Sequence, residues 1–166
     1  MGKPKYMVDT CSFTQLRRSY PSDVFPSTWN KISDLAQKDQ IASIDEVLEE
    51  LSAQDSDEVY KLAKKYKSIF YPLDQTIQEK AKEILSQYPG LLDLKNNKSG
   101  ADQFLISAAV IHDCIVVTEE KFQNNNENKP RIPNVCKYLG IKCINLLGML
   151  GAMPRRPYYR RPSWYR

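Results

Sequence analysis

The chain has 166 residues, which suits one domain with a sizeable core, and its formal net charge is +4. No apolar run approaches the roughly 18 residues of a membrane-spanning helix, and the first residues lack the apolar stretch of a signal peptide, so we expect no membrane. The single histidine, His112, argues against zinc sites built on histidines, and four cysteines without a Cys-x-x-Cys pair indicate reduced thiols in a cytoplasmic protein.

The positive charge belongs to the end of the chain. Residues 151–166 hold five arginines and no acid, which leaves 19 of the 24 lysines and arginines against 20 acids in the other 150 residues. We therefore divide the chain into a domain at 1–150 and a basic aromatic tail at 151–166.

Apolar periodicity predicts alternating strands and helices in both halves of the domain. In chain order the first half is predicted as a strand at 5–10, a helix at 27–38, a strand at 40–44, a helix that includes 47–51, a helix at 56–67, a short strand at 68–71 and a helix at 76–88. The second half is predicted as a polar loop at 95–100, a helix at 101–111, a strand at 114–118, a mobile Asn-rich stretch at 123–130, a helix at 133–139, a strand at 141–145 and a closing turn at 146–150. Such alternation favours an α/β fold with a parallel central sheet.

Two helix starts resemble capping boxes, in which a hydroxyl residue and an acid three residues later each accept a hydrogen bond from the other's backbone N–H. The pairs are Ser43 with Glu46, and Thr76 with Glu79. A cap is also the ordinary explanation for Asp102, in the first turn of the helix at 101–111.

Four acids stand out by their positions. Asp9 ends the first strand, Glu50 lies on the helix after the second strand, Asp102 opens the helix at 101–111, and Glu120 follows the strand at 114–118. Because the carboxyl ends of parallel strands meet at one edge of a sheet, we expect the four carboxylates to converge there.

Clustered carboxylates repel one another unless a cation neutralises them, and Mg²⁺ or Mn²⁺ is the natural partner for oxygen ligands. Such ions activate water and stabilise the leaving oxygen of a phosphodiester without any histidine or nucleophilic side chain. The alternative for Glu119 and Glu120 is that both are solvated surface acids, and either of the two is a candidate for the site. Glu46 lies one turn from Glu50 on the same helical face, so either of these two is a candidate as well.

The sequence resembles PIN domains in four motifs, which follow one another in the family's order between residue 5 and about residue 147. They are YMVDT at 6–10, VLEEL at 47–51, GAD with LISAA at 100–109, and VVTEEKF at 116–122. The resemblance implies a three-layer α/β/α fold with about five parallel strands in the order 3-2-1-4-5. It also implies a metal-dependent ribonuclease, and small bacterial members are often VapC-type toxins paired with an antitoxin.

Carried over residue by residue, the resemblance makes Asp9 and Asp102 direct Mg²⁺ or Mn²⁺ ligands. Glu50 would hold or orient the ion, and Glu120 would be the fourth acid, with Glu119 as its competitor. Supporting roles fall to the neighbouring side chains Thr10, Ser12, Glu46 and Thr118. Cys11 departs from the asparagine or serine common in the family, and we expect Ser12 to replace its hydrogen bonds to the acids.

The tail interleaves arginines with aromatic side chains, and its prolines prevent a regular helix. Its candidate RNA-binding residues are Arg155, Arg156, Tyr158, Arg160, Arg161 and Trp164, because arginine contacts phosphate and aromatics stack on unpaired bases. Docking on an acidic protein and a purely solvated tail are the alternatives.

The leading hypothesis is a Mg²⁺- or Mn²⁺-dependent endoribonuclease, the toxin of a toxin–antitoxin pair, with RNA as substrate, an antitoxin as partner and a homodimer as its assembly. A non-catalytic PIN-like module that binds RNA or protein through the tail is the alternative. A phosphorylation receiver domain ranks low, because residues 69–71 offer no phosphoacceptor aspartate.

Overall fold

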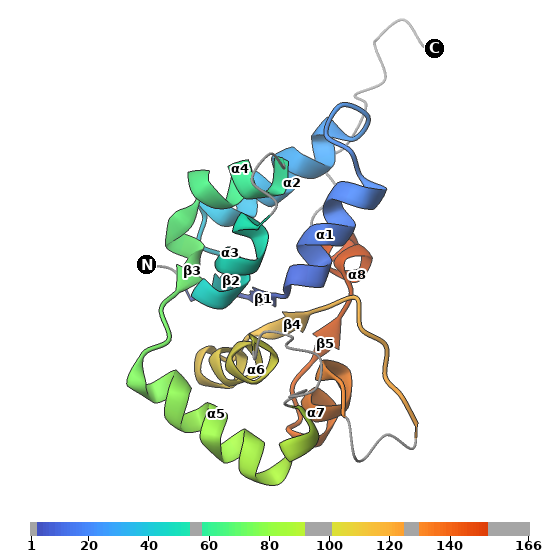
Figure 1. The fold of residues 1–166 in the computed structure, drawn as a ribbon. Helices are drawn as coiled ribbons and strands as arrows, with labels where there is room; N and C mark the ends of the chain where they lie inside the picture. The colour runs from blue at the N-terminus through green and yellow to red at the C-terminus, as the bar shows by residue number, and fades with distance from the viewer. Residues whose placement is uncertain (1–2, 54–57, 92–100, 125–129, 153–166) are drawn as a thin grey trace, which may run out of the picture.

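The computed structural model describes residues 3–53, 58–91, 101–124 and 130–152. Five parallel strands form one central sheet in the order β3-β2-β1-β4-β5 (Figure 1). The strands are β1 (Tyr6–Val8), β2 (Ile41–Ile44), β3 (Phe70–Tyr71), β4 (Ile115–Val117) and β5 (Cys143–Ile144). The predicted α/β class, the parallel sheet and the strand order are therefore confirmed.

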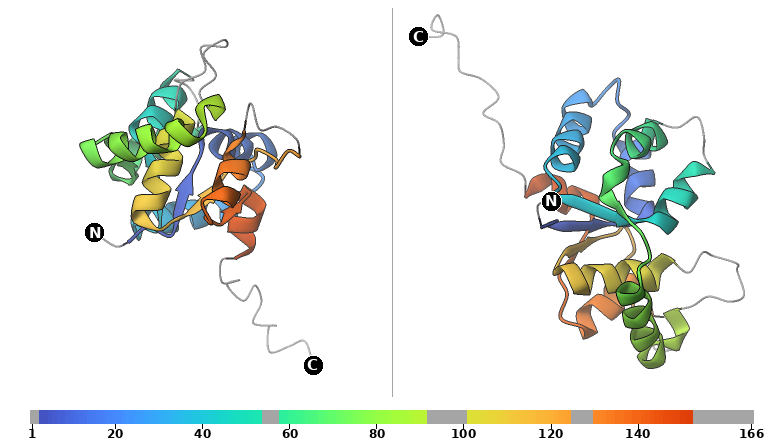
Figure 2. Two further views of the ribbon diagram at one scale, coloured as in Figure 1. Left: turned by 90° about the horizontal axis from the view of Figure 1, so that it is seen from below. Right: turned by 90° about the vertical axis from the view of Figure 1, so that its left-hand side faces the viewer.

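Helices cover both faces of the sheet, which gives three layers (Figures 1 and 2). One face carries α1 (Thr10–Ser19), α2 (Pro26–Gln37), α3 (Asp45–Ser52), α4 (Glu58–Lys65) and α8 (Leu146–Gly151). The other face carries α5 (Gln75–Gln87), α6 (Ala101–His112) and α7 (Ile132–Tyr138), and single 3₁₀ turns occupy Lys67–Ile69 and Pro89–Leu91. Among the described residues, no helix is both long and apolar enough to cross a bilayer.

The central strand β1 is buried on both sides, as a doubly covered parallel strand must be. Tyr6 pairs with Ile41 on one side and Ile115 on the other. Helix α6 packs beneath β1, β2 and β4, and its small residues Ala108 and Ala109 are buried there. This packing confirms the predicted small-residue helix.

Helix α1 was missing from the predicted elements. Only Phe13, Leu16 and Ser12 of its ten residues are buried, so the apolar stripe that would reveal it contains just two large side chains. Its start follows Asp9 directly, and this short connection turns the chain from β1 onto the helical layer. The aspartate therefore sits between a strand and a helix rather than inside a longer strand.

Both predicted capping boxes are wrong. Ser43 lies in β2, where its hydroxyl donates a 2.7 Å hydrogen bond to the carbonyl oxygen of Val8. Helix α5 is capped by Asp74, whose carboxylate accepts a 2.9 Å hydrogen bond from the backbone N–H of Ile77. The predicted loop at 95–100, most of the Asn-rich stretch and nearly all of the tail lie outside the described residues.

Candidate functional site

Asp9 lies at the carboxyl end of β1 and is only 7 % exposed. Its backbone N–H donates a 2.9 Å hydrogen bond to the carbonyl oxygen of Val117, which joins the ends of β1 and β4. Its Oδ2 accepts hydrogen bonds from Thr118 Oγ1 at 2.8 Å and from Cys11 Sγ at 2.7 Å. Burial raises the pKa of Asp9, and these two hydrogen bonds oppose the rise.

Cys11 and Thr118 form a small network around this carboxylate. The two side chains lie 3.2 Å apart, and the backbone N–H of Glu119 donates a 3.1 Å hydrogen bond to the sulfur. Burial and the charge of Asp9 raise the pKa of Cys11 to about 12, so its thiol stays protonated and donates. The predicted replacement by Ser12 is wrong, because Cys11 itself donates to Asp9. The Ser12 hydroxyl is buried and has no hydrogen-bond partner among the residues that the structure describes.

Glu50 comes to the same place from α3. Its Oε2 accepts a hydrogen bond from Thr10 Oγ1, in the first turn of α1. Burial raises the pKa of Glu50, the Thr10 hydrogen bond lowers it, and the negative charge of Asp9 raises it further. Glu50 and Asp9 therefore lie close enough for their negative charges to interact.

Glu46 lies one turn before Glu50 on α3. Its pKa is also raised, mainly by burial and then by the charges of Glu49, Asp45 and Glu50. The acids that raise the pKa of Glu46 all lie on α3, whereas Glu50 is also affected by the charge of Asp9 and is bound by Thr10. Between these two candidates, the structure therefore favours Glu50 as the partner of Asp9.

Asp102 lies in the first turn of α6, at the same edge of the sheet. The other end of α6 leads into Cys114, whose sulfur contacts the carbonyl oxygen of Pro4, just before β1 begins. The helix therefore runs against the strands and begins where β1 ends. His112 lies at the far end of α6, with its ring 4.8 Å from that of Tyr71, so the single histidine is remote from Asp102.

Glu119 and Glu120 both follow β4, and their carboxylates bind the starts of two different helices. Glu119 Oε1 accepts a 2.7 Å hydrogen bond from the backbone N–H of Leu146, the first residue of α8. Glu120 Oε2 accepts one of 2.9 Å from the backbone N–H of Ile132, the first residue of α7. Carboxylates are favourable at helix N-termini, so each acid has a structural role.

Three buried side-chain atoms have no hydrogen-bond partner within the described ranges: Ser12 Oγ, Glu46 Oε2 and Gln103 Oε1. They lie in the first turns of α1, α3 and α6, the helices that also carry Thr10, Glu50 and Asp102. Buried polar atoms are nearly always paired, so each of these three atoms has unused capacity to bind water or an ion. Gln103 had no role in the sequence prediction, and its position beside Asp102 is the only signal for it.

The donor atoms at this edge suit a hard cation. In the described part of the chain, no group of three or more His, Cys, Asp or Glu side chains is arranged to hold a metal. Mg²⁺, however, commonly uses one or two carboxylates, several waters and the phosphates of its substrate. Asp9 and Glu50 would supply the carboxylates of such a site, and Asp102, in the first turn of α6, is the further candidate ligand.

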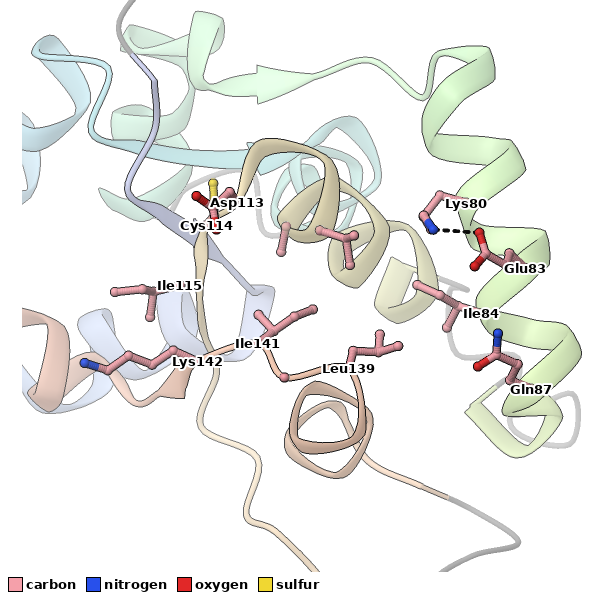
Figure 3. A pocket seen from close by; sticks show the side chains of 13 residues that line it. Lys80, Glu83, Ile84, Gln87, Asp113, Cys114, Ile115, Leu139, Ile141 and Lys142 are labelled. Atoms are coloured by element: carbon pink, nitrogen blue, oxygen red, sulfur yellow. Dashed lines mark hydrogen bonds and ion pairs between the residues drawn. The ribbon is translucent and has the colours of Figure 1, made fainter.

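A separate pocket of about 420 Å³ lies between α5, the end of α6 and the loop that leads into β5 (Figure 3). Lys80 and Glu83 form a 2.6 Å ion pair on its α5 side. Asp113 and Cys114, which follow α6 and precede β4, line it at the C-terminal end of α6. The candidate acids Asp9, Glu50, Asp102 and Glu120 are absent from the residues that line this pocket.

Comparison with known proteins places the chain in one family. Residues 6–155 match the family described as Domain of unknown function (DUF4411), and the chain belongs to this family. No curated protein matches the sequence.

Proposed function

Because membership of the DUF4411 family assigns no activity, we propose from the geometry of this sheet edge that the protein is a Mg²⁺- or Mn²⁺-dependent endoribonuclease. The observation that carries the proposal is a pair of carboxylates held by neighbouring side chains at the end of β1, where Cys11 and Thr118 bind Asp9 and Thr10 binds Glu50. Asp9 is almost fully buried, and its charge raises the pKa of Glu50. A divalent cation between the two would relieve this repulsion.

The bound ion would supply an activated water and stabilise the leaving oxygen of a phosphodiester. Asp9 and Glu50 would hold it, with Asp102 as a further ligand. Thr118 and Cys11 keep the Asp9 carboxylate oriented, and Thr10 does the same for Glu50. Fixed hydrogen-bond partners of this kind commonly set the position and basicity of metal ligands.

The choice of RNA as substrate rests on the resemblance to PIN domains, as does the proposed pairing with an antitoxin. Expression of the intact chain in a bacterial host tests both ideas together. Growth arrest that disappears with Asp9→Asn supports a toxin. Normal growth at high expression of the folded wild-type protein argues against that assignment and leaves the nuclease proposal to the assay below.

The direct test is cleavage of a fluorescently labelled single-stranded RNA by the purified protein with Mn²⁺, Mg²⁺ or EDTA. We expect cleavage with the metals only, and its loss in Asp9→Asn and in Asp102→Asn. Asp23→Asn, at an exposed position between α1 and α2, is a control that changes the net charge equally. RNA cleavage that survives both site substitutions at the wild-type rate would refute the proposal.

A non-catalytic module is the second candidate, and the helix-capping bonds of Glu119 and Glu120 favour it. Each has one carboxylate oxygen bound to a helix start, so the fourth acid of a nuclease site is already engaged. This candidate predicts no Mn²⁺ binding at the carboxylates. Isothermal titration separates the two, because Mn²⁺ binding that is lost in Asp9→Asn excludes an inert module.

A further inference from the structure

A pocket of about 440 Å³ opens beside the candidate site, between the end of β4, α7 and β5. Thr118 and Glu120 line its inner side. Thr118 is the same residue whose hydroxyl binds Asp9, so the pocket begins one side chain away from the buried carboxylate. Its volume lies within the usual range for pockets that bind small organic groups.

An exposed aromatic ring stands at this pocket. Phe122 is 41 % exposed and follows Glu120 by two residues. Lys137 on α7 also lines the pocket, and its Nζ lies 4.6 Å from the centre of the Phe122 ring. The pair therefore combines a flat apolar surface with a positive charge, which are the two features that proteins use to bind single-stranded nucleic acid.

The remaining wall is suited to a flat ring with polar edges. Ile141 and Ile144 contribute apolar surface. Asn145 lines the same wall and caps α8, since its Oδ1 accepts a 2.8 Å hydrogen bond from the backbone N–H of Gly148. That bond uses the amide oxygen and leaves the NH₂ group as a donor. A nucleobase has the matching properties, because its faces are apolar and its edge carries hydrogen-bond acceptors.

We propose that this pocket binds an unpaired nucleobase of the RNA, next to the phosphate that lies at Asp9, with the base stacked on Phe122. The proposal rests on the proposed ribonuclease function for the identity of the polymer. Lys137 then lies where it can also neutralise a neighbouring phosphate of the strand. The pocket would thereby place the strand relative to the carboxylates without taking part in the chemistry.

The test measures binding without cleavage. Fluorescence anisotropy of a labelled single-stranded RNA, in EDTA, gives the affinity of the wild type and of Phe122→Ala. We expect affinity to fall roughly tenfold in Phe122→Ala, because stacking on one base contributes an effect of this size. Phe122→Trp should keep the affinity, and its indole fluorescence should be quenched on binding, measured as the change relative to the wild type.

Leu147→Ala is the matched control, since Leu147 is also a large exposed apolar side chain, at 62 %, and does not line the pocket. Phe122→Ala within twofold of the wild type overturns the proposal, as does an equal loss in Leu147→Ala. Lys137→Ala should lower the affinity less at high salt than at low salt, because its contribution is electrostatic.

This binding experiment separates the two proposals. If RNA binds through Phe122 but is never cleaved with Mn²⁺, the result supports the nucleobase pocket and contradicts the nuclease function. If cleavage depends on metal but Phe122→Ala leaves the affinity unchanged, the result contradicts the nucleobase pocket and supports the nuclease function. A wild-type protein with no affinity for RNA overturns the pocket.

Discussion

The hydroxyl group of Thr118, just after β4, donates a 2.8 Å hydrogen bond to the carboxylate of Asp9, just after β1. These strands are neighbours in the centre of the sheet, although they are separated by more than a hundred residues in the chain. In the order β3-β2-β1-β4-β5, the chain adds β2 and β3 on one side of β1 and then β4 and β5 on the other side. Open parallel sheets bind ligands at the point where the strand order changes sides in this way. The hydrogen bond thus lies at the place where this fold type favours a ligand.

Replacing Thr118 with valine keeps the shape of the side chain and removes its hydroxyl. Asp9 then loses one of its two side-chain hydrogen bonds while remaining buried, so we expect Thr118→Val to lower the free energy of unfolding by about 1–3 kcal/mol. Urea denaturation measures this loss. Thr118→Ser keeps the hydroxyl and should recover most of the stability, and equal losses in both variants would show that packing, not the hydrogen bond, matters at this position.

The raised pKa values of Asp9 and Glu50 predict how stability depends on pH without metal. Both groups hold protons more tightly in the folded protein than in the unfolded chain. Unfolding therefore releases protons, and the free energy of unfolding should fall as the pH rises from the ordinary carboxyl values through the raised ones. Thermal melts between pH 4 and 8 in EDTA measure this slope, and added Mn²⁺ should recover stability at the upper end.

Asp9→Asn removes the charge at the centre of this effect. We expect a flatter pH dependence and, at pH 7 in EDTA, an unfolding free energy higher by on the order of 1–2 kcal/mol. Mn²⁺ should no longer stabilise the variant. Asp23→Asn serves again as the exposed control and should follow the wild type. An Asp9→Asn protein that is less stable than the wild type at pH 7 would contradict the view that the buried charge of Asp9 destabilises the metal-free protein.

The sheet could be predicted from the sequence because its strands are continuous short apolar runs, of which 115–117 is the clearest. Asp9 could be recognised because an acid directly after such a strand has few ordinary explanations. The roles of Glu119 and Glu120 could not be predicted in this way. Their partners Leu146 and Ile132 lie 27 and 12 residues further along the chain, and only the packing of α8 and α7 brings those backbone groups within reach.

The role of Cys11 also could not be predicted from the sequence. A thiol is a weak donor, so the sequence favoured Ser12 as the partner of the acids. In the structure, the first turn of α1 directs Cys11 toward Asp9 and buries the hydroxyl of Ser12. The direction of a side chain in a helix depends on where the helix begins, and α1 was absent from the predicted elements.

Single substitutions of Glu119 and Glu120 should have different effects on stability and on RNA cleavage. Glutamine keeps an oxygen that can accept the helix-start hydrogen bond, whereas alanine does not. We therefore expect Glu119→Ala to lower the free energy of unfolding by about 0.5–2 kcal/mol, and Glu119→Gln to be milder. Glu119→Gln should leave RNA cleavage nearly unchanged, because its carboxylate is directed to α8.

Glu120→Gln should instead reduce cleavage by roughly 10–100-fold with little loss of stability. Glu120 lines the pocket beside Thr118, and the nuclease proposal uses as its fourth acid the Glu120 carboxylate oxygen that is not bound to the backbone of Ile132. Single-turnover cleavage rates with saturating Mn²⁺, together with urea denaturation of the same samples, measure both quantities. The reverse pattern, with cleavage lost only in the Glu119 variant, would assign the site to Glu119.

The four free thiols should differ in reactivity, because the thiolate is the nucleophile. A hydrogen bond from Cys136 lowers the pKa of Cys143, although burial and the charge of Glu120 oppose this, and the same contact raises the pKa of Cys136. Burial raises the pKa of Cys114 to about 11 and, with the charge of Asp9, that of Cys11 to about 12. Cys143 is therefore the thiol that ionises first as the pH rises.

We expect iodoacetamide at pH 8 to modify Cys143 before the other three cysteines, at a rate that rises with pH below 9. Mass spectrometry of tryptic peptides measures this, since cleavage after Lys137 and Lys142 places Cys136 and Cys143 on different peptides. Cys136→Ala removes the hydrogen-bond donor, so Cys143 should then react more slowly at the same pH. Equal rates for all four thiols are expected only in urea, and the same result for the folded protein would contradict the Cys136–Cys143 contact.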